Sequence, residues 1–212
     1  MSFFGITDFG LFCAAVVLLN ATPGPDTAYI VGRSIAQGRA AGLMSALGIA
    51  AGCCVHVVAT AFGLTAILAA SATLFELIKL AGGAYLVYLG VRMLWARPSP
   101  AKAATAPQAH RALTTMFWQA TATNLLNPKV ILFFVSFFPQ FVRVDAPAKT
   151  TAFLMLGVVF VLMSTLWNSG TAILAGTLAR RAGQNPQFKQ WLERTVGAAF
   201  VALGLKLALT KN

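Results

Sequence analysis

Long apolar stretches are the feature that most constrains this chain. Several stretches of its 212 residues exceed the roughly 20 apolar residues that a helix needs to cross a bilayer. The mean hydropathy is +0.76, and only 10% of the residues are charged. A soluble domain usually carries about 25% charged residues, so this chain lacks the polar surface that water requires. The sequence therefore predicts an all-α polytopic membrane protein.

The apolar stretches predict six transmembrane helices, separated by short connectors. Their approximate ranges are 7–35, 41–68, 74–95, 113–141, 149–178 and 191–209. Residues 96–112, between the third and fourth helices, are rich in alanine, proline and lysine, which is the composition of a flexible linker. We expect residues 1–95 and 113–212 to form two three-helix repeats, joined by a cytoplasmic linker within one membrane domain.

The positive charges predict how the chain is oriented. The net charge is +11, but the charges are spread over connectors instead of one face of a folded domain, which argues against nucleic acid binding. We assign most of the lysines and arginines to the first, third and fifth connectors: Arg33, Arg39, Arg92, Arg97, Lys102, Arg111, Arg180, Arg181 and Lys189. The positive-inside rule then predicts that these connectors are cytoplasmic and that both termini are periplasmic.

Two internal similarities indicate a duplication. Residues 83–92 align without gaps with residues 197–206, and the Leu-Leu-Asn sequence at 18–20 recurs at 125–127, each time before a proline. A repeat with an odd number of spans must lie in the membrane in the opposite orientation to its copy. The sequence therefore predicts two inverted three-helix repeats, an architecture found in many transporters.

Small residues at helical spacing predict close packing between the helices. Gly38 and Gly42 are four residues apart, as are Gly48 and Gly52. Glycines on one stripe of a helix let a neighbouring backbone approach closely in a membrane. This pattern also permits a homodimer without requiring one.

Prolines interrupt two of the predicted spans. Residues 22–25, Thr-Pro-Gly-Pro, break the first helix, and Asn127-Pro128 breaks the fourth. Proline removes a backbone donor, and the carbonyls it frees need partners within the hydrocarbon region. Corresponding breaks in two halves of a transporter are the best sequence indication of its substrate site.

An ionisable residue follows each break. Asp26 comes after Pro25, and Lys129 comes after Pro128. Because a charge near the bilayer centre costs about 2.5–3.5 kcal/mol, both side chains should face the interior, where they could pair. The start of a half-helix suits a carboxylate and Asp26 suits an ammonium group, so we predict a zwitterionic ligand. The alternative is that the prolines are only kinks and that Asp26 caps the following half-helix.

The polar residues around the breaks form the predicted substrate site. Its members are Asn20, Thr22, Gly24, Asp26, Asn124, Asn127 and Lys129, and the helices break at Pro23, Pro25 and Pro128. Asp26 and His56 are candidates for proton coupling, with a structural role for the histidine equally open. Gln119 could line the cavity or join helices, and Asn168 could make an interior polar contact. No metal-ligand spacing is visible among the three cysteines, so we predict neither a metal nor a cofactor.

Taken together, the motifs resemble the LysE/RhtB family of amino acid exporters. They are Thr-Pro-Gly-Pro-Asp at 22–26, Gly-Gly-Ala-Tyr-Leu at 82–86, Asn-Pro-Lys at 127–129 and Phe-Pro-Gln-Phe at 138–141. The resemblance extends over the whole chain. It implies a protein of the bacterial inner membrane that exports amino acids by proton antiport. Lysine, threonine, homoserine, leucine and other substrates remain open.

Three classes of function compete. The first is a secondary exporter of small zwitterions; the sequence lacks the phosphate-binding loop that ATP use would require. The second is an intramembrane enzyme, which is disfavoured because neither paired carboxylates nor a metalloprotease motif is present. The third is a passive small-solute channel or a structural subunit. A channel would be expected to arrange its charges as rings, not at a helix break.

Overall fold

The computed structural model describes residues 3–71 and 112–175, together with 73, 77, 80, 84, 87, 88 and 91. Within these residues the regular structure is helical, apart from an isolated antiparallel bridge between Ile6 and Val142. The predicted all-α fold is therefore confirmed. The predicted sixth span, most of the third, nearly all of the linker and the match between 83–92 and 197–206 lie outside the described residues. The division into inverted repeats stays a prediction.

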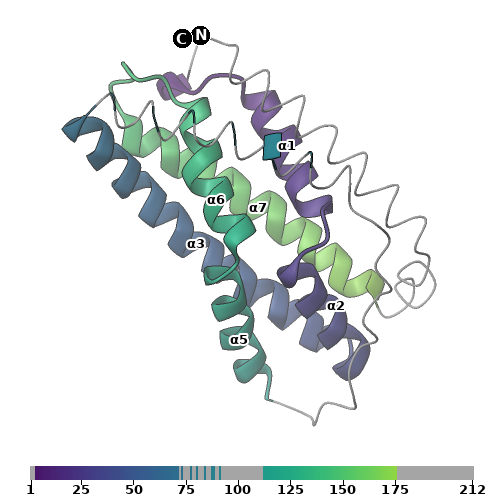
Figure 1. Ribbon diagram of the computed structural model, residues 1–212. Helices are drawn as coiled ribbons and strands as arrows, with labels where there is room; N and C mark the ends of the chain where they lie inside the picture. Colours follow the sequence, from purple (N-terminus) through teal and green to yellow (C-terminus); the bar gives the residue numbers. More distant parts are fainter. Residues whose placement is uncertain are drawn as a thin grey trace.

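Two long helices pack against each other along the bundle (Figure 1). They are α3 (Arg39–Ala70) and α7 (Lys149–Ala175), and both are long and apolar enough to cross a membrane. Lys149 is the one Asp, Glu, Lys or Arg of α7 and stands at its first position, as Arg39 does in α3. Their exposed large side chains are apolar: Leu47, Val55, Val58 and Phe62 on α3, and Val158, Leu162, Leu166 and Ile173 on α7. A surface of this kind faces lipid, so the protein is a polytopic membrane protein.

Two bent pairs of helices accompany the long ones. In the first pair, α1 (Phe9–Ala21) and α2 (Pro25–Gln37) meet at an angle of 53°. In the second, α5 (Leu113–Leu125) meets α6 (Pro128–Phe137) and its short extension η2 (Phe138–Phe141) at 52°. A further short helix, η1 (Phe3–Gly5), precedes α1. The sequence correctly predicted both breaks.

The chemistry of each break explains why the second helix of each pair begins where it does. Pro25 and Pro128 occupy the first turn of α2 and α6, where the missing N–H costs nothing. The N-cap of α6 is Asn127, whose side chain accepts a hydrogen bond from the backbone N–H of Lys129 at 3.1 Å. The N-cap of α2 is Gly24, without a side-chain cap. Asp26 therefore does not cap α2, and its carboxylate is available for another role.

The packing brings the two breaks together. Helix α3 packs against α2, α5 and α7, and α7 also contacts α1 and α2. Each long helix thus touches a bent pair from the other predicted half of the chain. Figure 1 shows the two breaks at about the same level of the bundle. Polar groups freed at either break therefore meet in the same layer.

Glycines of α3 make the close contacts that their spacing predicts. A Cβ atom at Gly42 would collide with Ser34, and one at Gly48 with the backbone carbonyl of Phe117. At Gly52 it would lie 2.6 Å from Oδ1 of Asn124. Gly38 instead has open space around it and a φ of +87°, so it serves the sharp turn between α2 and α3.

Two glycine-to-alanine substitutions in α3 should differ in their effect on stability. Gly52→Ala should lower the free energy of unfolding by about 1–3 kcal/mol, because the new methyl group forces Asn124 out of position. Gly63→Ala should leave it unchanged or raise it by up to about 1 kcal/mol, because nothing lies within 4 Å of the added Cβ. Thermal unfolding of both variants in the same detergent checks this pair. Equal stabilities would show that α3 and α5 are not packed this closely.

A cluster of buried phenylalanines fills the bundle beside α6. Neighbouring rings lie 4.5 to 6.4 Å apart between centroids, and the members are Phe12, Phe133, Phe134, Phe137, Phe138, Phe141 and Phe160. The N-terminal segment is fastened to the same region, because the N–H of Thr7 donates to the carbonyl of Phe141 at 2.9 Å. The cluster closes the bundle on the α6 side of the breaks.

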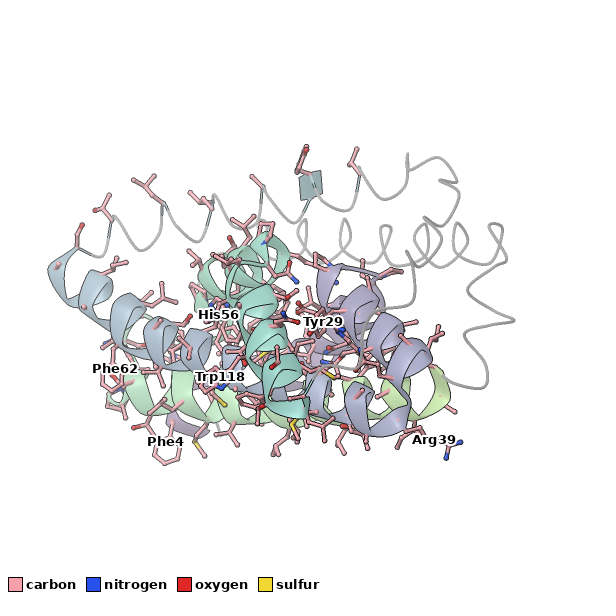
Figure 2. The ribbon with its side chains drawn as sticks, turned by 90° about the horizontal axis from the view of Figure 1, so that it is seen from below. Phe4, Tyr29, Arg39, His56, Phe62 and Trp118 are labelled. Carbon is pink, nitrogen blue, oxygen red and sulfur yellow. The ribbon has the colours of Figure 1, made fainter. Side chains whose placement is uncertain are left out.

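Arg33 corrects the predicted assignment of charges to connectors. It lies inside α2 with only 5% of its surface exposed, so it is not a connector residue. A lone arginine near the end of an apolar run cannot be told from a loop charge by sequence. The connector between α2 and α3 is Gly38 alone, and Arg39 projects from the edge of the bundle (Figure 2). The predicted orientation, which rests on charges in other connectors as well, stays a prediction.

Candidate functional site

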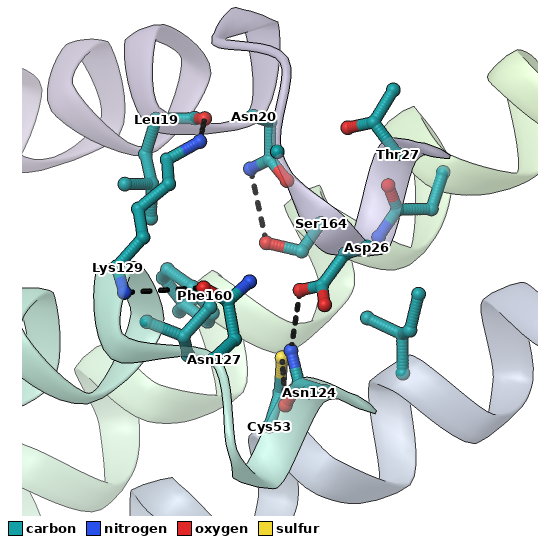
Figure 3. Close-up of a pocket in the computed structure, with 14 residues that line it drawn as sticks. Leu19, Asn20, Asp26, Thr27, Cys53, Asn124, Asn127, Lys129, Phe160 and Ser164 are labelled. Atoms are coloured by element: carbon teal, nitrogen blue, oxygen red, sulfur yellow. Dashed lines mark hydrogen bonds between the residues drawn. The ribbon is translucent and has the colours of Figure 1, made fainter. Parts of the chain in front are cut away.

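A small, partly enclosed cavity lies between the two helix breaks. Its volume is about 30 Å³, and residues from six helices surround it (Figure 3). The lining residues are Leu19, Asn20, Gly24, Asp26, Thr27, Ile49, Cys53, Asn124, Asn127, Lys129, Val130, Phe160, Ser164 and Asn168. A larger groove of about 700 Å³ lies between α1 and α7, but its wall is almost wholly apolar, as suits lipid. The polar cavity is therefore the candidate site.

The cavity is small. A volume of about 30 Å³ has room for a water-sized molecule. Pockets that hold small organic ligands usually measure about 300–1,000 Å³.

Asp26 supplies the negative charge of the cavity. Its Oδ2 accepts a hydrogen bond from Nδ2 of Asn124 at 2.7 Å, which joins α2 to α5. Its other oxygen, Oδ1, is buried and has no hydrogen-bond partner within 3.5 Å among the described residues, although the side chain of Asn127 also acts on this carboxylate. A buried carboxylate oxygen without a donor is costly, so it is suited to receive a donor from a ligand.

Asn124 is held in place from α3. Sγ of Cys53 donates to its side-chain Oδ1 at 3.6 Å, and Nε2 of His56 lies 3.3 Å from its backbone carbonyl. Because a carbonyl only accepts, the Nε2 of His56 must carry the proton in this bond. The imidazole also stacks on Phe134 at 5.5 Å and does not line the cavity. His56 thus lies behind Asn124, and its part in proton coupling stays a prediction.

Lys129 connects the second break to the first. Its Nζ donates to the backbone carbonyl of Leu19 at 2.6 Å and to that of Thr22 at 2.8 Å. These carbonyls belong to the end of α1, where the break removes helical partners. The described residues contain no direct ion pair between Lys129 and Asp26, so the pairing considered from the sequence is replaced by a bond to the backbone. An ammonium group has a third N–H, which remains for a ligand.

Six of the seven predicted substrate-site residues line the cavity, and Thr22 is the exception. Its hydroxyl donates to the carbonyl of Leu18 at 2.8 Å, within its own helix. Nδ2 of Asn20 donates to the carbonyl of Val16 at 2.8 Å and to Oγ of Ser164 at 3.0 Å. The structure therefore places the predicted residues together, while the role of each stays a prediction.

One face of α7 was not part of the predicted site. Phe160, Ser164 and Asn168 line the cavity, and their spacing of four places them on one stripe of the helix. Asn168 is buried, in agreement with the interior contact that the sequence predicts. Ser164 and Asn168, which are polar and four residues apart in a mostly apolar helix, were the signal that could have identified this face.

The charges and donors of the cavity match a zwitterion. The described lining residues carry one carboxylate, that of Asp26, and one ammonium group, that of Lys129. In α2, the amide of Ala28 donates to the carbonyl of Gly24 at 2.9 Å. The amides of Asp26 and Thr27 lie before this bond, at the start of the helix, where amides have no acceptor within the helix. Amides at a helix start favour an anionic group. The described residues contain no group of three or more His, Cys, Asp or Glu side chains that could hold a metal ion.

Comparison with known proteins gives the family. Residues 17–211 match the family model described as LysE type translocator. An uncharacterized membrane protein of Pseudomonas aeruginosa is 37% identical over 208 residues, with 96% of each chain covered. A leucine efflux protein of an Enterobacter species is 28% identical over 205 residues, with 97% of each chain covered. No solved structure matches the chain. The chain belongs to the LysE family of translocators.

Proposed function

We propose that the protein is a secondary transporter that exports amino acids or similar small zwitterions across the bacterial inner membrane by proton antiport. The observation that carries the proposal is the pair of opposite charges, Asp26 and Lys129, that two helix breaks bring to one cavity. The family and the relatives named leucine efflux proteins support it. Both termini are periplasmic in this proposal, and α2 ends at the cytoplasmic side.

The lining favours neutral, apolar amino acids. Leu19, Ile49, Val130 and Phe160 supply apolar walls. Among the described lining residues, Asp26 is the one carboxylate, and it is required for the α-ammonium group. A lysine substrate would bring a second ammonium group without a second carboxylate to receive it, which is costly in a buried site. We therefore propose leucine and amino acids like it as substrates.

The proposed pose follows from the free donors and acceptors. The substrate ammonium donates to Oδ1 of Asp26, the oxygen without a partner. The substrate carboxylate accepts from the amide of Thr27 and from the third N–H of Lys129, which the two carbonyls of α1 hold in place. The apolar side chain lies against Phe160. A carboxylate that binds an ammonium ion cannot also hold a proton, so exchange at Asp26 couples the two movements.

Alternating access requires the small cavity to widen and to open to one side at a time. In inverted-repeat transporters, one part of the bundle rocks against the other around a central site. The helix breaks act as hinges, because each one interrupts the backbone hydrogen bonding between the two helices of a bent pair. The phenylalanine cluster beside α6 closes the periplasmic side in the proposed orientation.

Counterflow in proteoliposomes tests the proposed function. The purified protein should exchange labelled leucine for internal unlabelled leucine, and a pH gradient should drive its accumulation against a concentration gradient. Protein-free liposomes and labelled lysine serve as controls. Failure to exchange any amino acid would contradict the proposal. Flux that only follows the concentration gradient, with no counterflow, would indicate a passive channel instead.

A further inference from the structure

We propose that Arg33 forms a second subsite, which binds the carboxylate of the substrate on its way from the cytoplasm to Asp26. The proposal rests on the proposed function, and it adds a place where the substrate is first held. It is carried by a buried guanidinium that lacks an anionic partner. Arg33 is 5% exposed, and its NH1 is buried with no hydrogen-bond partner among the described residues.

The described contacts of the guanidinium are with neutral groups. Its NH2 donates to Oε1 of Gln119 at 3.0 Å, and its Cζ lies 5.1 Å from the ring centre of Tyr29. The salt bridge found among the described residues joins Arg143 to Asp145 elsewhere in the protein. A buried charge without a counter-charge is strongly unfavourable, and the planar fork of arginine matches a carboxylate. An anionic ligand would supply the negative counter-charge that the described residues do not provide.

Arg33 shares its helix face with Asp26. Asp26, Tyr29 and Arg33 are spaced by three and four residues, so they lie on one stripe of α2. The facing helix α5 binds this stripe at two levels: Asn124 contacts Asp26, and Gln119 contacts Arg33 and Tyr29. Seven residues of helix separate the two charges by about 10 Å along the axis. A polar strip thus connects Arg33 with the cavity.

The direction of transport assigns the order of the two subsites. Arg33 lies in the last turns of α2, four residues before its end at Gln37, on the cytoplasmic side in the proposed orientation. An exported molecule entering from the cytoplasm meets this guanidinium before it reaches Asp26. The carboxylate is held first at Arg33, and the ammonium group then moves to the free oxygen of Asp26. Gln119 positions the guanidinium, since its Oε1 also accepts from the hydroxyl of Tyr29 at 3.1 Å.

The first arm of the test measures carboxylate binding without transport. 4-Methylpentanoate is leucine without its ammonium group, so it should bind at Arg33 without needing Asp26. It should raise the melting temperature of the wild type and of Asp26→Asn, and should not raise that of Arg33→Gln. Neutral-lipid nanodiscs exclude an anionic lipid headgroup as the occupant. Equal shifts in the wild type and Arg33→Gln overturn the proposal, whether or not the protein transports leucine.

The second arm measures transport from the cytoplasmic face. Arg33→Gln should raise KM for leucine by about tenfold or more, the expected effect of losing a charged hydrogen bond. Competition by leucinamide, which lacks the carboxylate, should be unchanged. The KM of Arg33→Lys for leucine should lie between those of the wild type and Arg33→Gln, because lysine keeps the positive charge but lacks the planar guanidinium. Arg39→Gln, which removes an exposed arginine at the start of α3, is the matched control and should stay within about twofold of the wild-type KM.

The outcomes of the two arms are distinguishable. Equal weakening of leucine and leucinamide by Arg33→Gln would show a structural role and overturn the subsite. An effect of Arg33→Gln that appears only in anionic lipid would assign the guanidinium to a lipid headgroup and also overturn it. Absence of leucine transport by the wild type would contradict the proposed function, while the melting-temperature arm would still decide on Arg33.

Discussion

Replacing Asp26 by asparagine should lower leucine transport by about 100-fold and leave the fold intact. The asparagine Oδ1 can still accept the hydrogen bond that Asn124 now donates at 2.7 Å. The negative charge that faces the substrate ammonium is lost, and a charged hydrogen bond of this kind contributes about 1.5–3 kcal/mol. The proton-binding group is removed with it. Initial counterflow rates give the transport loss, and the melting temperature in detergent verifies the fold.

Asp145→Asn is the matched control for this substitution. Arg143 donates two hydrogen bonds to Asp145, at 2.9 and 2.6 Å, and they hold the pKa of that carboxyl below its usual value. The pair is exposed, so losing it should change neither stability nor transport appreciably. A wild-type rate for Asp26→Asn would remove Asp26 from the substrate site. A loss of transport in both variants would instead indicate a general sensitivity to charge.

Replacing Lys129 by methionine should destabilise the protein and abolish transport together. Two backbone carbonyls at the end of α1, those of Leu19 and Thr22, lose the donor that now lies at 2.6 and 2.8 Å. Each unpaired buried carbonyl costs about 1–3 kcal/mol, and the hydrocarbon around the bundle offers no water to replace the donor. The cavity also loses its positive charge. Unfolding in detergent and leucine counterflow measure the two effects.

Lys149→Met provides the comparison for Lys129→Met. Lys149 is the first residue of α7, where a positive charge is not favoured by the helix dipole. Its replacement should change the free energy of unfolding by no more than about 0.5 kcal/mol. Wild-type stability of Lys129→Met would show that the bond between the two breaks contributes little. The carbonyls of Leu19 and Thr22 would then have to accept hydrogen bonds from other donors.

The sequence predicted the described spans well because hydrocarbon imposes simple rules. Apolar length located α3 and α7, and proline chemistry located the breaks before Pro25 and Pro128 within one residue or two. The same reasoning predicted most of the polar residues that line the cavity, because a polar residue beside a helix break needs an interior position. The predicted duplication depends mostly on segments outside the described residues.

The partners of individual side chains were not predictable from sequence. Arg33 was assigned to a connector because its partner, Gln119, is 86 residues away in the chain. Lys129 was expected to face the interior, where it could pair with Asp26, but its ammonium group instead bonds to the carbonyls left by the first break. Thr22 satisfies its hydroxyl within α1, as threonine often does in helices. These choices depend on distances that only the packed structure defines.

The movement of protons against leucine tests the central claim most directly. Proteoliposomes loaded with leucine and an internal pH dye should acidify inside when diluted into leucine-free buffer, because each leucine that leaves is exchanged for entering protons. The same vesicles with Asp26→Asn should show no acidification, and those with Asp145→Asn should match the wild type. Leucine efflux from the wild type without internal acidification would contradict exchange of substrate and proton at Asp26.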